Sequence, residues 1–475
     1  MGIQNISTKE ALKMSIYGSI IVPQTPLILP EIGRGREKTI QSTIDACRAA
    51  CARVSEWKPD LLIISSPHTV SYANYFHISP GISADGSMEA FGEPQLKFHV
   101  EYDTAFREEF IRLAQQAGIP AGTLGERDPK LDHGVCIPLY FLREAGIDCP
   151  VVRMGLSGLS PLAHYKLGIC AARAAEKLGR RAAFIASGDL SHMLLKSGPY
   201  GVAKEGPVFD EQVTSAMAEG DFLKFLTFDP SFCDRAAECG LRSFQIMAGA
   251  LDGLKVDPEL LNYEGPFGVG YAAAVFTVTG RDENRRFGKV YEEMERRRLE
   301  KMKASEDPFV KLARLSLETY VRTGKHLKTV PAGLPEEMTA RRAGAFVSLH
   351  IHGQLRGCIG TIAPTAENLA SEIINNAVSA GSLDPRFSPV RENELQLLEY
   401  SVDVLSPAEP IDSAAELDVK RYGVIVSCGE RRGLLLPDLD GVDTPEQQVD
   451  IARRKGGIEP DEPYTLKRFE VVRHR

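Results

Sequence analysis

Short apolar runs alternate with longer amphipathic segments between residues 18 and 187, and this alternation restricts the fold more than any other feature. Segments with the period of a helix lie at about 36 to 57, 103 to 117 and 161 to 178. Such alternation predicts an α/β domain with a largely parallel sheet covered by helices on both faces. The apolar runs that we expect to be its strands are GSIIV (18–22), LLIIS (61–65), VVRMG (151–155) and AAFIAS (182–187).

A highly charged segment separates this part of the chain from the rest. In residues 281–307, 17 of the 27 side chains are charged, nine basic and eight acidic. Mixed charge with few apolar positions predicts a solvated helical connector. Beyond it, helices near 307 to 323 and 365 to 380 are interleaved with strand-like, alternating segments. We therefore assign three parts: a domain at 1–280, a charged helical linker at 281–306 and a smaller α+β domain at 307–475.

Composition argues against several classes of partner. A net charge of −8 and a pI near 5.8 leave no basic face for a phosphate backbone, so we expect no nucleic acid. No stretch approaches the roughly 18 apolar residues of a membrane span, and the N-terminus lacks a secretory apolar segment. Nine cysteines, an odd number spread over both halves, fit reduced thiols. We therefore expect a cytoplasmic protein with no membrane partner.

Polar side chains gather where the predicted strands end. His68 follows LLIIS in a Ser-Pro-His string, His133 lies in Asp-His-Gly, and Asp189 and His192 lie in SGDLSH after AAFIAS. Ligands of such sheets bind outside the carboxyl ends of the strands. One strand-end histidine is commonly a structural side chain, whereas several with nearby carboxylates match the two-histidine, one-carboxylate set that holds non-haem iron. These four residues are therefore candidate site residues.

A glycine string near the end of this domain does not predict a nucleotide site. Gly268 and Gly270 begin a Gly-x-Gly-x-x-Ala string that leads into the strand-like segment AAAVFTVTG. A dinucleotide fingerprint needs a helix N-terminus at this place to hold the pyrophosphate. We therefore expect no nucleotide cofactor. Glu264, just before the string, is a candidate carboxylate of the substrate pocket.

These motifs resemble those of the LigB-type (class III) extradiol ring-cleavage dioxygenases and their relative Memo, over about residues 15 to 280. The resemblance implies a three-layer α/β/α fold, a small-molecule substrate and an Fe(II) site. By this resemblance His68 and Glu238 are metal ligands, and His133 and His192 are acid and base groups of the pocket. The motifs that carry it are Ser66-Pro67-His68, Asp132-His133-Gly134-Val135, SGDLSH at 187–192 and Glu238-Cys239-Gly240.

Gln24 stands after the first predicted strand, where the resemblance implies a histidine ligand. An amide oxygen is a much weaker donor to Fe(II) than imidazole, so we assign Gln24 to the substrate pocket. Cys239 competes with Glu238, because Memo-like relatives imply a cysteine ligand there. Three alternatives stay open: iron with Gln24 or water completing the site, another metal such as zinc or copper on His68, His192 and Cys239 or Glu238, and a pocket without metal.

The C-terminal domain carries the string LRGCIGT at residues 355–361. Glycines on either side of Cys358 leave backbone amides open to a ligand, and Arg356 could lower the pKa of the thiol, as suits a nucleophile or a redox-sensitive thiol. The alternative is a small core residue in a tight hairpin. Together with Asp384-Pro385-Arg386-Phe387 and RGLLLP at 432–437, the string resembles the AMMECR domain family. Cys358 is our candidate catalytic residue here, and Arg356, Asp384 and Arg386 are candidate substrate-binding residues.

A Memo-like domain followed by an AMMECR domain resembles the fused component of the AmmeMemoRadiSam system. This resemblance implies a separate radical SAM enzyme as partner. Two functions remain open. One is a metal-dependent, dioxygenase-like enzyme that the AMMECR domain assists. The other is a non-oxygenase binding or modification module whose metal site is degenerate and which works with the radical SAM partner.

Overall fold

The computed structural model describes residues 14–125, 129–351, 353–439 and 441–475. It divides into two units, Met1–Met294 and Glu295–Arg475, and the division falls within helix α10 (Phe287–Ser305). The expectation that no secretory segment precedes the first strand falls on residues 1–13, outside the described residues. Of the helices in the described ranges, none is both long and apolar enough to cross a membrane.

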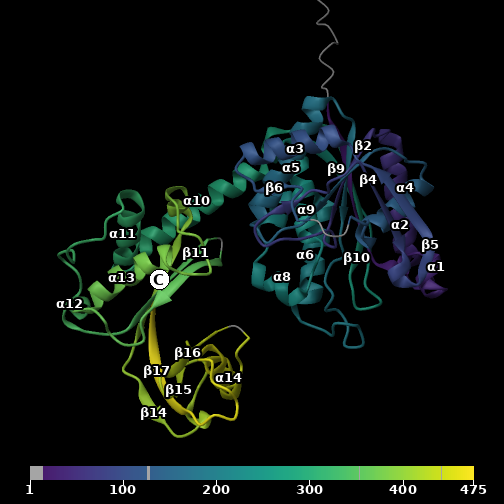
Figure 1. Cartoon of the computed structure of the whole chain (residues 1–475). Coiled ribbons are helices and arrows are strands. Elements are labelled where there is room, and N and C mark those ends of the chain that lie inside the picture. Colours follow the sequence, from purple (N-terminus) through teal and green to yellow (C-terminus); the bar gives the residue numbers. More distant parts are fainter. Residues whose placement is uncertain (1–13, 126–128, 352, 440) are drawn as a thin grey trace, which may run out of the picture. The chain divides into compact units, whose positions relative to one another are not determined.

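A six-stranded sheet forms the centre of the N-terminal unit, in the order β7-β2-β8-β1-β10-β9 (Figure 1). The first four strands pair in parallel, as the sequence predicts. The last two are antiparallel and complete one edge of the sheet. The strands are β1 (Ile16–Val22), β2 (Leu61–Ser66), β7 (Val151–Gly155), β8 (Ala182–Ser187), β9 (Leu254–Glu264) and β10 (Tyr271–Arg281).

Helices cover both faces of this sheet, which confirms the three-layer α/β/α fold. Helices α2 (Gln41–Trp57) and α4 (His133–Glu144) pack on one face, in a core that contains Ile20 of β1. Ile21, the next residue of β1, lies in the core on the opposite face. This alternation is what a strand buried on both sides requires. The helices on that second face include α3 (Thr104–Gln116), α5 (Pro161–Leu178) and α9 (Leu241–Ala250).

Smaller elements surround the sheet of the N-terminal unit. Strands β4 (Ser83–Met88) and β5 (Glu93–Glu101) form an antiparallel pair, and β3 (Phe76–His77) pairs with β6 (Ala121–Gly122). The remaining helical elements are η1 (Pro26–Ile28), α1 (Pro30–Gly33), η2 (Arg36–Ile40), η3 (Glu89–Phe91), α6 (Glu205–Glu219), α7 (Phe222–Leu226), α8 (Pro230–Ala236) and η4 (Glu283–Arg285).

The C-terminal unit is the predicted α+β domain. Its antiparallel sheet has the order β12-β11-β13-β17-β15-β16, and β14 pairs with β17. The strands are β11 (Ala345–Ile351), β12 (Gln354–Gly360), β13 (Glu399–Leu405), β14 (Glu409–Ile411), β15 (Tyr422–Cys428), β16 (Arg431–Leu435) and β17 (Thr465–His474). The helical elements are α11 (Pro308–Thr323), α12 (Glu336–Ala340), α13 (Leu369–Ser382), η5 (Glu392–Leu397), η6 (Ala414–Glu416) and α14 (Pro445–Lys455).

Two helices of the N-terminal unit, α5 and α9, approach each other closely at their glycines. A Cβ atom added at Gly249 would lie 1.8 Å from the backbone oxygen of Tyr165, and one added at Gly168 would lie 1.9 Å from that of Ile246. Backbone atoms cannot move aside as a flexible side chain can. Glycine at these positions therefore allows α9 to pack directly against α5.

Replacement of Gly249 by alanine should destabilise the N-terminal unit. Because the added methyl group forces the two helices apart, we expect Gly249→Ala to lower the free energy of unfolding by about 1–3 kcal/mol. Gly280→Ala is the matched control, since an added Cβ there meets nothing within 4 Å. Urea unfolding followed by fluorescence of the single tryptophan, Trp57 in α2, reports on this unit. Equal stability of the two variants would contradict the close-packing argument.

Candidate functional site

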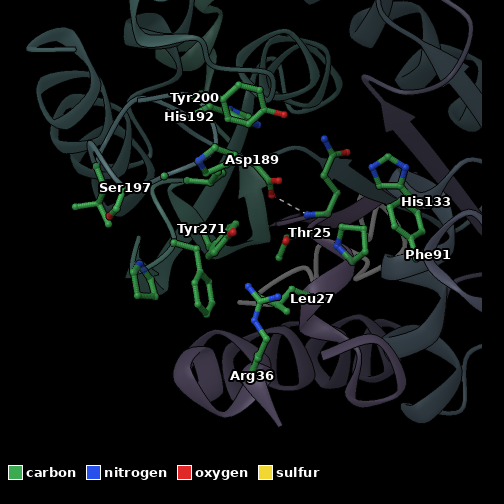
Figure 2. A pocket seen from close by; sticks show the side chains of 18 of the residues that line it. Thr25, Leu27, Arg36, Phe91, His133, Asp189, His192, Ser197, Tyr200 and Tyr271 are labelled. Carbon is green, nitrogen blue, oxygen red and sulfur yellow. Dashed lines mark hydrogen bonds between the residues drawn. The ribbon is translucent and has the colours of Figure 1, made fainter. Parts of the chain in front are cut away.

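A cavity of about 750 Å³ opens at the carboxyl ends of the parallel strands. Its lining includes residues that directly follow β1, β2 and β8, as the topology of the sheet predicts. Four aromatic side chains, Phe91, Tyr200, Phe267 and Tyr271, provide planar and apolar surface. Figure 2 shows His192 and Tyr200 on one side of this pocket and His133 and Phe91 on another. The predicted residues that line it are Gln24, His68, His133, Asp189 and His192.

Two glycines bring the SGDLSH and Glu-Cys-Gly motifs together. A Cβ atom added at Gly188 would lie 2.3 Å from the Cα atom of Gly240, so the two backbones cross without room for a side chain. This crossing places the Cys239 thiol 3.5 Å from the Asp189 carbonyl oxygen, to which it donates a hydrogen bond. The glycines of the two motifs are therefore needed for the close approach of the segment after β8 to the segment before α9.

Gln24 is buried at the end of β1 and makes three hydrogen bonds. Its backbone N–H donates to Oδ1 of Asp189 at 2.8 Å. The side-chain Nε2 donates to the sulfur of Cys239 at 3.3 Å, and Oε1 accepts from the Ser187 hydroxyl at 3.3 Å. Both ends of the amide are thus occupied by protein groups. Gln24 connects β1 to the end of β8 and to the segment before α9.

The three predicted histidines line one cavity as neutral imidazoles. The ring centroids of His68 and His133 are 3.9 Å apart. His133 contacts Phe91 edge-on, with ring centroids 5.2 Å apart, and His192 contacts Tyr200 in the same way, with ring centroids 5.1 Å apart. Burial lowers the pKa of all three side chains, for His133 to about 4 with a further contribution from His68. At neutral pH each ring can therefore accept a proton.

The ring of His192 is held by two backbone groups. Its Nδ1 lies 3.1 Å from the backbone oxygen of Leu190, and the backbone of Ala237 forms a second hydrogen bond with the ring. His192 also lines the cavity, so its ring can contact a bound molecule.

Two aspartates of the motifs have different roles. Burial raises the pKa of Asp189 to about 7, although the N–H of Gln24 opposes the shift. Asp189 lines the cavity and can therefore hold a proton near neutral pH. Asp132 instead accepts hydrogen bonds at 2.7 Å from the hydroxyls of Ser66 and Thr69. Asp132 precedes α4 directly, so these bonds fix the start of the helix and with it the position of His133.

The candidate metal ligands do not form a complete set. Glu238 accepts a hydrogen bond from the backbone N–H of Leu241 at 2.7 Å, its pKa is raised to about 7 by burial, and it does not line the cavity. Burial, with Asp189 and Glu238 nearby, raises the pKa of the Cys239 thiol well above its usual value. Among the described residues, no three His, Cys, Asp or Glu side chains are arranged to hold a metal ion. With Gln24 also committed, these donors do not fit an Fe(II) site of two imidazoles and a carboxylate.

Glu264 lies outside the cavity lining. Its Oε1 accepts hydrogen bonds from the backbone N–H of Thr43 at 2.9 Å and from the Asn262 side chain at 3.3 Å. The carboxylate thus connects the end of β9 to the first turn of α2. Its negative charge also interacts favourably with the dipole of that helix. Arg36, which no motif marked, lines the cavity from η2.

In the C-terminal unit, three of the four selected residues contact one another. Cys358 donates its backbone N–H to Oδ2 of Asp384 at 2.9 Å, and Arg386 pairs with both oxygens of Asp384 at 2.9 and 2.7 Å. Arg356 instead pairs with Glu394 at 2.7 and 3.1 Å. The predicted lowering of the Cys358 pKa is wrong, because burial raises it and Arg356 is committed elsewhere. The arrangement is that of a turn in which the exposed Arg386 pairs with the buried carboxylate of Asp384.

The fold and the pocket define a class: an α/β/α domain with its ligand cavity at the strand ends, followed by an antiparallel α+β domain. Comparison with known families agrees with this description. The family model described as the catalytic LigB subunit of aromatic ring-opening dioxygenase matches residues 18–276, and the AMMECR1 model matches residues 310–474. The chain therefore belongs to the LigB family and carries an AMMECR1 domain at its C-terminal end.

Similar proteins cover either the whole chain or one part of it. Protein CA_C1420 of Clostridium acetobutylicum is 38% identical over 97% of this chain and 100% of its own length. A protein of Thermotoga maritima is 53% identical over 36% of this chain and 98% of its own length. The crystal structure of the uncharacterized protein PH0010 from Pyrococcus horikoshii covers 35% of this chain and 88% of its own, with 32% identity and a TM-score of 0.33.

The ion pair of Asp384 should make the stability of the C-terminal unit depend on pH. Hydrogen bonds from Arg386 hold the pKa of this buried carboxyl below its usual value. A lowered pKa means that the stabilisation is present above about pH 4, the ordinary pKa of aspartate, and is lost as the pH falls below it. We expect Asp384→Asn to reduce the free energy of unfolding by roughly 1–3 kcal/mol at neutral pH.

The difference between wild type and Asp384→Asn should shrink when urea unfolding is repeated in acid. The exposed Asp461 gives the matched control, because Asp461→Asn removes a charge that has no buried partner. A stability gap that is independent of pH would show that the Asp384 charge is not the stabilising feature.

Proposed function

We propose that the LigB domain binds a small molecule in the strand-end cavity and catalyses a proton transfer on it, without a metal ion held by the predicted ligands. The observation that carries this proposal is the convergence of three imidazoles on one cavity beside Asp189, with burial lowering the pKa of each ring. Proton transfer needs a base of suitable pKa within hydrogen-bond reach of the substrate. His192 supplies the base, and Asp189 is placed to hold or return a proton.

The movement of the proton follows from these positions. The unprotonated ring nitrogen of His192 accepts a proton from the substrate, and the electron pair of the broken bond stays on the substrate. The Leu190 carbonyl continues to accept from Nδ1 and stabilises the imidazolium that forms. Asp189, with a pKa of about 7, can donate a proton to the product on the same wall of the cavity. His68 and His133 remain neutral and provide further hydrogen-bonding groups.

The second candidate is metal-dependent, dioxygenase-like oxidoreductase chemistry. Membership of the LigB family and the presence of His68 and His192 in one cavity favour it. It would require Gln24 to give up its hydrogen bonds or another group to complete the ligand set. Iron, zinc and copper are the metals to consider for this candidate, because its donors combine imidazole with carboxylate or thiolate.

We also propose a radical SAM enzyme as the working partner of this chain and the cytoplasm as its location. The order of the two domains, LigB followed by AMMECR1, supports the partner. In this scheme the radical enzyme and the LigB pocket act on related small molecules, and the AMMECR1 domain assists one of these steps.

Removal of the base should abolish proton transfer. We expect wild-type protein, incubated in D₂O with a small-molecule cell extract, to cause at least one metabolite to gain deuterium, as detected by mass spectrometry. His192→Gln keeps a side chain of similar size but removes the base, so the gain should disappear. His99→Gln is the control, because His99 is exposed and bonded to Asp85 and Glu101 on the β4–β5 pair. Equal deuterium gain in wild type and His192→Gln would contradict the proposal.

A histidine at position 24 should create the metal affinity that the native donors lack. We expect anaerobically purified wild type and His68→Ala to hold little iron, and Gln24→His to bind it, because imidazole is a stronger donor to Fe(II) than an amide. The iron content is measured by elemental analysis. Gln24→Asn is the control, because it alters the hydrogen bonds of Gln24 without adding an imidazole ligand. Stoichiometric iron in wild type that His68→Ala removes would instead support the metal-dependent candidate.

A further inference from the structure

Strand β12 forms one edge of the sheet in the C-terminal unit. Among the strands of the described residues, it pairs with β11 alone. The N–H and C=O groups on the free side of an edge strand can bond to a further strand, which makes such an edge prone to association with another chain. The fold therefore needs some feature that keeps a second chain from adding there.

The sequence of β12 offers little of the usual protection. Charged residues and proline commonly protect an edge, and β9, at the edge of the sheet in the N-terminal unit, contains Asp257, Pro258 and Glu259. The one charged residue of β12 is Arg356, which lies at a shift in register near the start of the strand and is already ion-paired. Residues 357–360, GCIG, contain neither a charge nor a proline. Another part of the chain must therefore protect this half of the strand.

Two side chains bind the backbone groups of Cys358 that would bond to a further strand. Cys358 lies opposite Ser348 of β11. Its N–H, however, donates to Oδ2 of Asp384 at 2.9 Å, and its backbone oxygen accepts from the guanidinium group of Arg386 at 3.3 Å. At alternate residues of an antiparallel pair, both backbone groups point away from the neighbouring strand. Asp384 and Arg386 thus occupy the place that a further strand would take.

The two side chains belong to a closed turn that holds them against β12. Asp384 is buried and lies two residues after the end of α13. Its backbone oxygen accepts from the N–H of Phe387 at 3.1 Å, and the N–H of Val390 donates to the backbone oxygen of Gly381 at 2.8 Å. Arg386 pairs with both carboxylate oxygens of Asp384 at 2.9 and 2.7 Å. Because these bonds fix the turn at both ends, the carboxylate and the guanidinium group stay at the edge of the sheet.

We propose that Asp384 and Arg386 guard this edge and keep β12 from pairing with β12 of a second copy of the chain. A second copy presents the same N–H and C=O groups with the same spacing, as a twofold-symmetric contact requires. In an antiparallel pair centred on Cys358, the two Cys358 residues lie opposite each other and Arg356 lies opposite Gly360, so like charges do not face each other. This inference concerns the AMMECR1 domain and does not depend on the proposed function.

The experiment opens the edge and measures self-association of the full chain by sedimentation velocity. We expect Asp384→Ala to lower the dimer dissociation constant on the order of tenfold relative to wild type, because the freed N–H of Cys358 gains a strand partner. Arg386→Ala frees the C=O group and should act in the same direction. Asp403→Ala is the matched control. Asp403 is also buried and pairs with Arg473 at 2.7 and 3.1 Å, but it lies on β13 inside the sheet, so its loss should not change self-association.

A cross-link at Cys358 identifies the surface through which two chains associate. The Cα atoms of two residues that exchange both backbone hydrogen bonds lie about 5.5 Å apart. A short thiol-to-thiol cross-linker should therefore join two chains of Asp384→Ala, and Cys358→Ser in the same background should prevent the cross-link while the dimer persists.

Circular dichroism verifies the fold of each variant, and Arg386→Ala decides the question if Asp384→Ala does not fold. The proposal is overturned if the folded edge variants associate no more than wild type, or if Asp403→Ala associates as strongly as they do. A cross-link that does not depend on Cys358 would equally contradict it, because the chains would then meet at another surface.

Discussion

The hydrogen bonds of Gln24 hold together the segments from which the pocket is built. One residue contacts Asp189, Ser187 and Cys239, and so joins the end of β1 to the end of β8 and to the segment before α9. A buried amide is costly unless it is hydrogen-bonded, and here both its nitrogen and its oxygen have a partner. The position where the resemblance implies a metal ligand therefore joins three segments of the chain through hydrogen bonds. The positions of Asp189 and Cys239 depend on it.

The strands of the parallel sheet could be predicted because each is a short apolar run buried on both faces. Residues 151–155 and 182–187 are strands β7 and β8 with the predicted bounds. The antiparallel edge strand β9 was not predicted, because its sequence LKVDPELLNYE mixes charged and apolar residues and contains Pro258. Such a pattern is tolerated at an edge, where half of the backbone groups face no neighbouring strand.

Site residues could be predicted where the topology of the sheet determines their position. They could not be predicted where local hydrogen bonds determine the direction of the side chain. His68, His133 and His192 line one cavity because they follow strands or begin a helix at the same edge of the sheet. Glu238 and Glu264 have carboxylates as well, but backbone N–H groups at the starts of α9 and α2 bind them. A sequence does not show which partner captures a carboxylate. The ion pair of Arg356 with Glu394, which lies far along the chain, could not be predicted for the same reason.

Burial determines how the ionisable groups of the pocket exchange protons. A low-dielectric wall disfavours charge, which lowers the pKa of the histidines and raises the pKa of Asp189 to about 7. In the proposed function, one wall therefore provides imidazoles that can accept a proton and a carboxyl group that can donate one near neutral pH. The same desolvation that disfavours charge thus supplies both partners of a proton transfer.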